Sequence, residues 1–175
     1  MSGPLASDAR DESALWDWAV AAYGRPGAKD ALLSLQDRHG IDVVLTLWRA
    51  WLWETRRRIT NEGEARAIAL SADWRQNVVT PLRRARNALK AAPAGIDADA
   101  ALALRRQLLD VELAAERLQL QALERLALTP AAAKPSETAL CGGRRSLYDH
   151  FVAFPPLASV PVVEIATLTT VLLGQ

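Results

Sequence analysis

Residues 97–128 read DADAALALRRQLLDVELAAERLQLQALERLAL, and this stretch decides the fold. Asp97 can cap a helix by accepting hydrogen bonds from its first free N–H groups. Apolar residues then alternate steps of four and three, which is a heptad seam of nearly three repeats. The seam consists of Leu104, Leu108, Val111, Ala115, Leu118 and Ala122. At about 1.5 Å per residue this helix would be about 45 Å long, and we expect it to form an antiparallel hairpin with the helix before it.

The helix before it is predicted from a second periodic stretch. Asn61, with Glu64 three residues later, resembles a capping box and opens this helix. Apolar residues then recur at helical spacing, at Trp74, Val78, Leu82, Ala85 and Leu89. Pro81 interrupts the run. Either the helix kinks there, or a new helix starts with Thr80 as its cap and Pro81 in its first turn.

Three shorter helices are predicted upstream. The first covers about residues 12–23. The second has Pro26 in its first turn and ends at Gly40, a residue that suits a helix C-terminus. Asp42 can cap the third, over about residues 43–58. Apolar residues cover most of the third helix, so we expect it to be the buried centre of the bundle.

The third helix keeps one narrow polar strip. Thr46, Arg49, Arg56 and Arg57 fall within about 60° of Trp53, at about 100° per residue. An exposed tryptophan ringed by arginines would suit a protein partner or an anionic ligand. We favour the alternative, in which Trp53 packs under a neighbouring helix while the arginines extend outward to water.

The C-terminal part has a different composition. Residues 129–145 are rich in Ala, Pro and Gly and are predicted to be a linker. Short helices are expected within residues 146–175, packed on the bundle of residues 1–128 because their apolar face needs cover. The predicted fold class is therefore all-α, an antiparallel helical bundle with a long helical hairpin.

Composition excludes several classes of protein. Cys141 is the only cysteine and the two histidines are distant, so neither an intramolecular disulfide nor a metal site is expected. The N-terminus lacks the apolar core of a signal peptide. The apolar runs at residues 43–53 and 160–173 are too short to span a bilayer. We therefore expect a cytoplasmic protein without a cofactor.

The charges are balanced overall, with 21 basic and 20 acidic residues, but residues 56–90 are rich in arginine. Arg83 and Arg86 share a helix face, where phosphate contacts are one interpretation. No helix-turn-helix, zinc or sheet-platform motif accompanies them. We favour ion pairing with the acidic long helix, through residues such as Glu112 and Glu116.

A candidate pocket is formed by residues at the ends of the first two helices: Asp17, Arg25, Asp37 and His39. Arg25 could clamp a carboxylate or phosphate there. Asp37 and His39 cannot pair within one helix, because positions two apart point about 160° away from each other. His39 also lies near a helix C-terminus, where a cation is favoured, so we favour a structural role for it. We find no catalytic nucleophile with a recognisable base and no phosphate loop.

Three motifs carry a family resemblance: YGRPG at residues 23–27, LQDRHGIDV at residues 35–43 and LW at residues 47–48. They resemble those of a bacterial family of all-helical proteins of unknown function, and the resemblance covers roughly residues 14–128. In that family we expect an Asn two residues after Asp42, where this chain has Val44. The resemblance supports the helical fold and implies no activity.

Three functional hypotheses follow. The first is a non-enzymatic helical module that acts through protein–protein contacts, with a partner or by self-association. The heptad seam, the apolar C-terminal segment and the lack of catalytic spacing favour it. The second is a nucleic-acid-associated accessory protein that uses the basic residues 56–90. The third is an enzyme or small-molecule binder with a pocket near Arg25 and His39. We favour the first.

Overall fold

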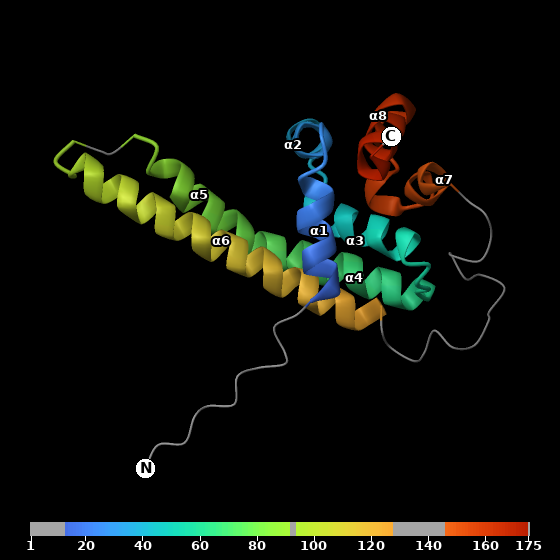
Figure 1. Cartoon of the computed structure of the whole chain (residues 1–175). Helices are drawn as coiled ribbons and strands as arrows, with labels where there is room; N and C mark the ends of the chain where they lie inside the picture. Colours follow the sequence, from blue (N-terminus) through green and yellow to red (C-terminus); the bar gives the residue numbers. More distant parts are fainter. Residues whose placement is uncertain (1–12, 92–93, 128–145, 175) are drawn as a thin grey trace, which may run out of the picture.

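The computed structural model describes residues 13–91, 94–127 and 146–174. These residues form helices and no strand, so the predicted all-α class is confirmed. Figure 1 shows α1 (Ala14–Tyr23), α2 (Ala28–His39), α3 (Val43–Glu54), α4 (Asn61–Trp74), α5 (Thr80–Ala88), α6 (Ala98–Ala127), α7 (Leu147–Val152) and α8 (Val162–Leu173). A π-helical turn, η1 (Arg75–Val79), joins α4 to α5, and a 3-10 turn, η3 (Pro155–Leu157), lies between α7 and α8.

Side-chain caps set where α1, α3 and α4 begin. Ser13 caps α1 and Asp42 caps α3, each accepting a hydrogen bond from the backbone N–H three residues later, at 3.2 Å and 3.0 Å. Such caps satisfy N–H groups that have no partner within the helix. Thr60 caps α4 in the same way at 3.0 Å. The predicted capping box of Asn61 and Glu64 is therefore wrong.

The core is built around α3, as the sequence predicted. Residues 44–52 of this helix are all buried, and α3 contacts α1, α2, α4, α6 and α7. Trp48 is 0% exposed, and its indole N–H donates to the Leu123 carbonyl of α6 at 3.1 Å. The helix ends at Glu54, which is four residues earlier than expected.

One continuous helix runs from α4 through η1 into α5. Pro81 has no backbone N–H, and its ring excludes a normal helical hydrogen bond to the Asn77 carbonyl four residues earlier. The π-helical turn ahead of it absorbs this defect. Val79 and Thr80 keep helical backbone angles, so no new helix starts at Thr80. Of the two predicted alternatives, the chain adopts the distorted continuous helix.

The long hairpin of α5 and α6 extends away from the other helices (Figure 1). We call α5 together with residues 98–112 of α6 the arm. No residue of α5 is buried, and in the α6 part of the arm only Ala101 and Glu112 are. The arm is therefore a pair of helices with almost no core of its own.

The contact face of α6 differs from the predicted heptad seam. Three seam residues, Leu104, Val111 and Leu118, are 48%, 49% and 54% exposed. The other three are partly or fully buried, and Ala115 is 6% exposed. The face that packs on the other helices also carries the polar residues Glu112 and Gln119, which are 4% and 2% exposed. The seam prediction is therefore wrong for half of its residues, because it assumed that only apolar residues face inward, while these two side chains have polar partners in the hairpin and the core.

The C-terminal helices pack on the N-terminal ones. α7 contacts α3, and α8 contacts α2. Glu164 at the start of α8 lies 2.9 Å from Arg38 Nη2 and 3.2 Å from His39 Nε2, both on α2. The predicted linker at residues 129–145, with Cys141, lies outside the described residues, so the domain boundaries stay a prediction.

Candidate functional site

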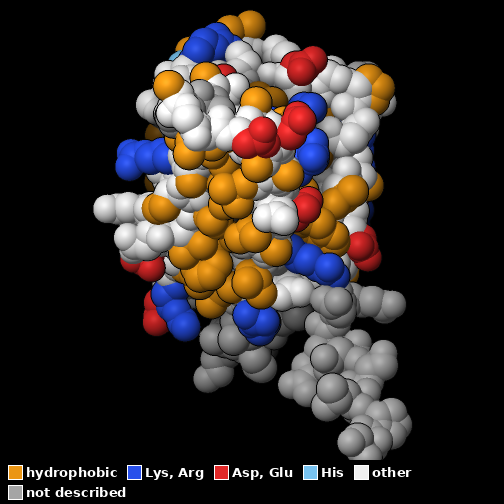
Figure 2. Space-filling model, turned by 90° about the vertical axis from the view of Figure 1, so that its left-hand side faces the viewer, with side chains coloured by type: hydrophobic (Ala, Val, Ile, Leu, Met, Phe, Trp, Pro, Cys, Tyr) orange, Lys and Arg blue, Asp and Glu red, His pale blue; other side chains and the backbone are white. Residues whose placement is uncertain are grey.

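Two apolar stripes run along opposite sides of α6. At about 100° per residue, the members of each stripe lie within about 40° of one another. The inner stripe is Leu102, Leu109 and Leu113, and the outer stripe is Leu104, Val111 and Leu118. All six side chains are between 43% and 54% exposed. Figure 2, a view from the side on which the arm projects, shows hydrophobic side chains gathered over the middle of that side of the molecule.

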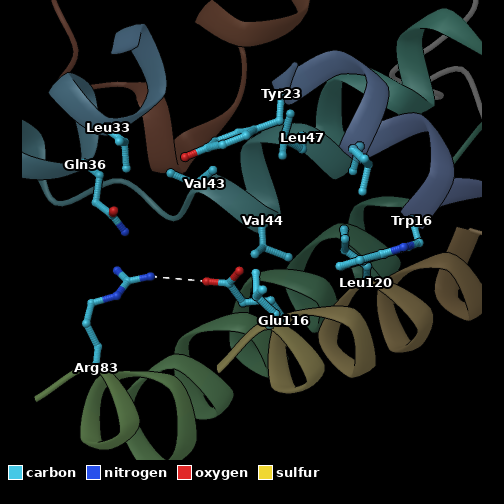
Figure 3. Close-up of a pocket in the computed structure, with 13 residues that line it drawn as sticks. Trp16, Tyr23, Leu33, Gln36, Val43, Val44, Leu47, Arg83, Glu116 and Leu120 are labelled. Carbon is cyan, nitrogen blue, oxygen red and sulfur yellow. Dashed lines mark hydrogen bonds and ion pairs between the residues drawn. The ribbon is translucent and has the colours of Figure 1, made fainter. Parts of the chain in front are cut away.

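The inner stripe leads into a pocket between α1, α2, α3, α5 and α6 (Figure 3). The pocket has a volume of about 230 Å³, and Leu113 of the inner stripe is one of its walls. Its other apolar walls include Trp16, Val20, Leu33, Leu47 and Leu120. Trp16 and Leu120 lie at one end, and Arg83 reaches toward Glu116 near the other. The pocket thus has an apolar end and a polar end.

Four charged groups at the polar end of the pocket share one network. Glu112 accepts hydrogen bonds from Arg83 Nε at 2.8 Å and from Arg86 Nε at 2.6 Å. Burial acts to raise the pKa of Glu112, but these hydrogen bonds and the two arginine charges outweigh it, so the pKa is lowered. Glu116 accepts a longer hydrogen bond, 3.2 Å from Arg83 Nη2. Arg83 is therefore shared, and its shorter contact is with Glu112.

The negative charge of Glu116 is balanced less well by nearby cations than that of Glu112. Burial raises its pKa, the Arg83 charge opposes this, and the nearby charges of Glu112 and Asp42 raise the pKa further. Tyr23, which lines the same pocket, also has a raised pKa, because its phenol is partly buried and lies near the Glu116 charge. A carboxylate in such surroundings gains from any further cation or N–H donor.

A buried polar network lies beside the pocket and fixes its shape. The Asp42 carboxylate accepts a hydrogen bond from Ser71 at 2.8 Å and from Gln119 Nε2 at 3.3 Å. Gln119 also donates to the Ser71 hydroxyl. These bonds hold the start of α3, where Val43 lines the pocket, against the turn of α6 that carries Glu116.

The polar strip predicted on α3 is not a surface site. Arg49 is 0% exposed, donates to Glu64 of α4, and lies 4.8 Å from the ring centre of Phe154. The prediction that Arg49 belongs to an accessible site is therefore wrong. Trp53 is half-buried and packs against the core, which agrees with the interpretation that we favoured over an exposed hot spot. Thr46 is also buried.

Arg56 and Arg57 do not share a helix face with Trp53. The helix stops before them, and Arg56 takes a φ of 54°, in the left-handed region that interrupts a right-handed helix. The Arg57 guanidinium lies 4.6 Å from the ring centre of Trp51. The predicted grouping assumed a helix to residue 58, and it is wrong for that reason.

The structure separates the residues that were predicted to form a pocket: Asp17, Arg25, Asp37 and His39. Both aspartates are exposed. Arg25 donates to the carbonyl of Leu172 near the end of α8, while His39 Nε2 lies 3.2 Å from Glu164 at its start. Eight residues of helix span about 12 Å, so these contacts are far apart. The predicted pocket is wrong, and both side chains hold α8 in place.

Arg83 and Arg86 form ion pairs with the acidic helix, which is the arrangement that we favoured for them. The pocket itself was not predicted, because five helices contribute to it. One sequence signal could have found it. Glu112, Glu116 and Gln119 follow one another at steps of four and three on α6, and polar residues at that spacing on an inward face indicate buried partners.

Two negative findings apply to the described ranges, residues 13–91, 94–127 and 146–174. No helix there is long and apolar enough to cross a membrane. The same residues contain no group of three or more His, Cys, Asp and Glu side chains that could hold a metal ion.

The fold and the site define an all-helical protein with a projecting hairpin arm and an apolar pocket where the arm meets the bundle. Residues 14–123 match the family described as "Protein of unknown function (DUF2390)", and the chain belongs to this family. The match includes every pocket residue and ends before α7. No curated protein and no solved structure matches the chain.

Proposed function

We propose that this protein is a non-enzymatic helical interaction module whose arm docks onto another protein chain. The observation that carries the proposal is the packing of the arm. The arm contains two buried residues from α6 and none from α5, yet it presents four large aliphatic side chains that are about half exposed, Leu102, Leu104, Leu109 and Val111, and Leu113 and Leu118 continue these rows along α6. Rows of exposed aliphatic side chains of this kind are typical of interaction sites.

The outer stripe suits a helical partner best. Leu104, Val111 and Leu118 recur every seven residues, which is the spacing of knobs that enter the holes of a facing helix. The small exposed side chain of Ala114 lies between Val111 and Leu118, and that of Ala100 lies one turn before Leu104, so both leave room for a close approach. Covering this row would remove apolar area from water at about 25 cal/mol per Å².

The stripe also fits two ways of docking. Its members are spaced symmetrically about Val111, so an antiparallel second copy would place Leu104 opposite Leu118. A different protein with an apolar helix face would make equivalent contacts. The mass of the purified protein in solution distinguishes the two partners, because only self-association with a second copy raises it.

The test uses a triple variant of the outer stripe, Leu104→Gln, Val111→Gln and Leu118→Gln. Glutamine is close to leucine in helix propensity and removes the apolar surface. The matched control is Val162→Gln with Val163→Gln on α8, where the side chains are 64% and 70% exposed.

Sedimentation velocity of the pure proteins and quantitative capture from nuclease-treated host lysate are compared across the three proteins. We expect the triple variant to lose self-association or a stoichiometric partner, and the α8 control to keep it. A triple variant that retains every association of the wild-type chain would refute the proposal.

The other hypotheses gain less support. Binding of nucleic acid by Arg83 and Arg86 would have to compete with their ion pairs to Glu112 and Glu116. The nuclease treatment tests this alternative, because a partner held through nucleic acid is lost. A cytoplasmic location and the lack of a metal or cofactor stay predictions from the sequence.

A further inference from the structure

We propose that the pocket between α1, α2, α3, α5 and α6 is a binding site for a small organic amine. The apolar body of the ligand would occupy the end formed by Trp16 and Leu120. Its ammonium group would lie at the polar end, next to the Glu116 carboxylate. This site is separate from the outer stripe, so it goes beyond the proposed docking function.

The size of the pocket limits the ligand. Its volume of about 230 Å³ compares with about 30 Å³ for each water molecule in the liquid. It lies just below the range of about 300–1,000 Å³ that is usual for drug-sized ligands. Val20 lines the pocket and is 54% exposed, so the pocket opens to solvent beside α1. A short alkyl or single-ring group fits this space.

The charge arrangement selects a cation. Arg83 Nε lies 2.8 Å from Glu112, whereas Arg83 Nη2 lies 3.2 Å from Glu116, so the guanidinium is the tighter partner of Glu112. Glu112 also has Arg86 at 2.6 Å. Glu116 is thus left with the longer contact to Arg83, and the Arg86 charge acts on it more weakly, in a site whose burial raises the pKa of this carboxyl. An ammonium group would supply the missing compensation.

Ligands of other charge fit less well. A carboxylate would meet Glu116 at short range and would have to draw Arg83 away from two ion pairs. A neutral alcohol would fill the apolar end but would bring no positive charge to the Glu116 carboxylate. The Tyr23 hydroxyl and the Gln36 side chain, which also line the pocket, offer oxygen acceptors for the remaining ammonium protons.

Three ligands with the same alkyl chain length distinguish a site for an amine from a site for an alcohol or a carboxylate. Isothermal titration calorimetry of the full chain at pH 7.5 and low salt would compare n-hexylamine, hexan-1-ol and hexanoate. A charge-assisted hydrogen bond is worth about 1.5–3 kcal/mol, so we expect hexylamine to bind about tenfold or more tightly than hexanol. Hexanoate should not bind measurably.

Two variants locate the amine. Glu116→Gln should weaken hexylamine binding about tenfold, to the level of hexanol. Its matched control is Glu54→Gln, which removes an exposed carboxylate 3.8 Å from Arg25 and should change nothing. Leu113→Trp enlarges a half-exposed wall residue, keeps the carboxylate, and should block both hexylamine and hexanol. Circular dichroism of each variant checks that it is folded.

Several titration results would overturn the proposed amine site. Hexanol binding as tightly as hexylamine would show an apolar pocket without amine recognition and would overturn it. Tighter binding of hexanoate, unchanged binding in both Glu116→Gln and Leu113→Trp, or no binding of hexylamine at all would overturn it as well. The outer-stripe triple variant should bind hexylamine normally, so failure of this site and failure of the docking function are distinguishable.

Discussion

Arg49 of α3 and Glu64 of α4 form an ion pair inside the core, where they are 0% and 8% exposed. Burial raises the pKa of Glu64, while the charge and hydrogen bond of Arg49 oppose this rise. The same guanidinium lies 4.8 Å from the ring centre of Phe154, in the segment that precedes η3. The pair therefore joins α3 and α4 to the C-terminal helices.

Removal of one partner from this pair should be costly. Glu64→Leu leaves a buried guanidinium without its carboxylate, and we expect a loss of about 3–5 kcal/mol in the free energy of unfolding. The double variant Arg49→Met with Glu64→Leu should lose less than the sum of the two single losses. Urea unfolding at pH 7 measures all of these values.

The control for this cycle is the pair of Arg25 and Glu54, which are 3.8 Å apart and partly exposed. Its coupling free energy should be about 0–1 kcal/mol. Additive losses at Arg49 and Glu64 would contradict the account of a coupled buried pair.

His150 should make the fold sensitive to acid. It is 4% exposed and its Nε2 lies 3.2 Å from the Arg49 carbonyl. Burial, with the Arg49 charge adding to it, lowers the pKa of His150 from 6.5 to about 4. Between these two values the unfolded chain binds more protons than the folded chain, so stability falls as pH falls through this window. The loss is at most about 1.4 kcal/mol per pH unit.

The measurement is the unfolding free energy at several pH values for the wild type and for His150→Gln. Glu64 and Glu116, whose raised pKa values favour the folded state in acid, act in the opposite direction, so the difference between the two proteins is the quantity to follow. We expect that difference to shift in favour of the variant between about pH 6.5 and 4. A parallel pH dependence in wild type and His150→Gln would contradict the assignment.

Two helix caps should differ in strength because their surroundings differ. Asp42 caps α3 and also accepts hydrogen bonds from the buried Ser71 and Gln119. Asp97 caps α6 at an exposed position, accepting from the Ala100 N–H at 2.8 Å. Asp97→Ala should cost about 0.5–1 kcal/mol. Asp42→Ala should cost about 1–3 kcal/mol more than that, since the buried Ser71 hydroxyl and Gln119 amide lose their shared acceptor and keep only the hydrogen bond to each other. Equal losses in thermal unfolding would show that the network adds nothing.

The sequence predicted the elements that depend on local chemistry. Asp42 starts α3, Gly40 ends α2 with a φ of 65°, and both positions follow from capping and from the freedom of glycine. The end of α3 was missed, because the left-handed backbone at Arg56 has no Gly or Asn to announce it.

The site depends on packing between distant segments, which periodicity does not contain. The heptad rule placed Leu104, Val111 and Leu118 in a seam, while the folded chain buries Glu112 and Gln119. Side-chain periodicity shows which residues share a face, but the partners on other helices decide which face is buried.

The central claim is that the outer stripe contacts another protein chain. A photo-crosslinking amino acid at Val111 tests it most directly, with the same group at Val163 of α8 as the control, because Val163 is 70% exposed. The account predicts a covalent adduct of higher mass at position 111, formed with a second copy or with a partner in the lysate, and none at position 163. Equal adducts at both positions, or none at position 111, would contradict it.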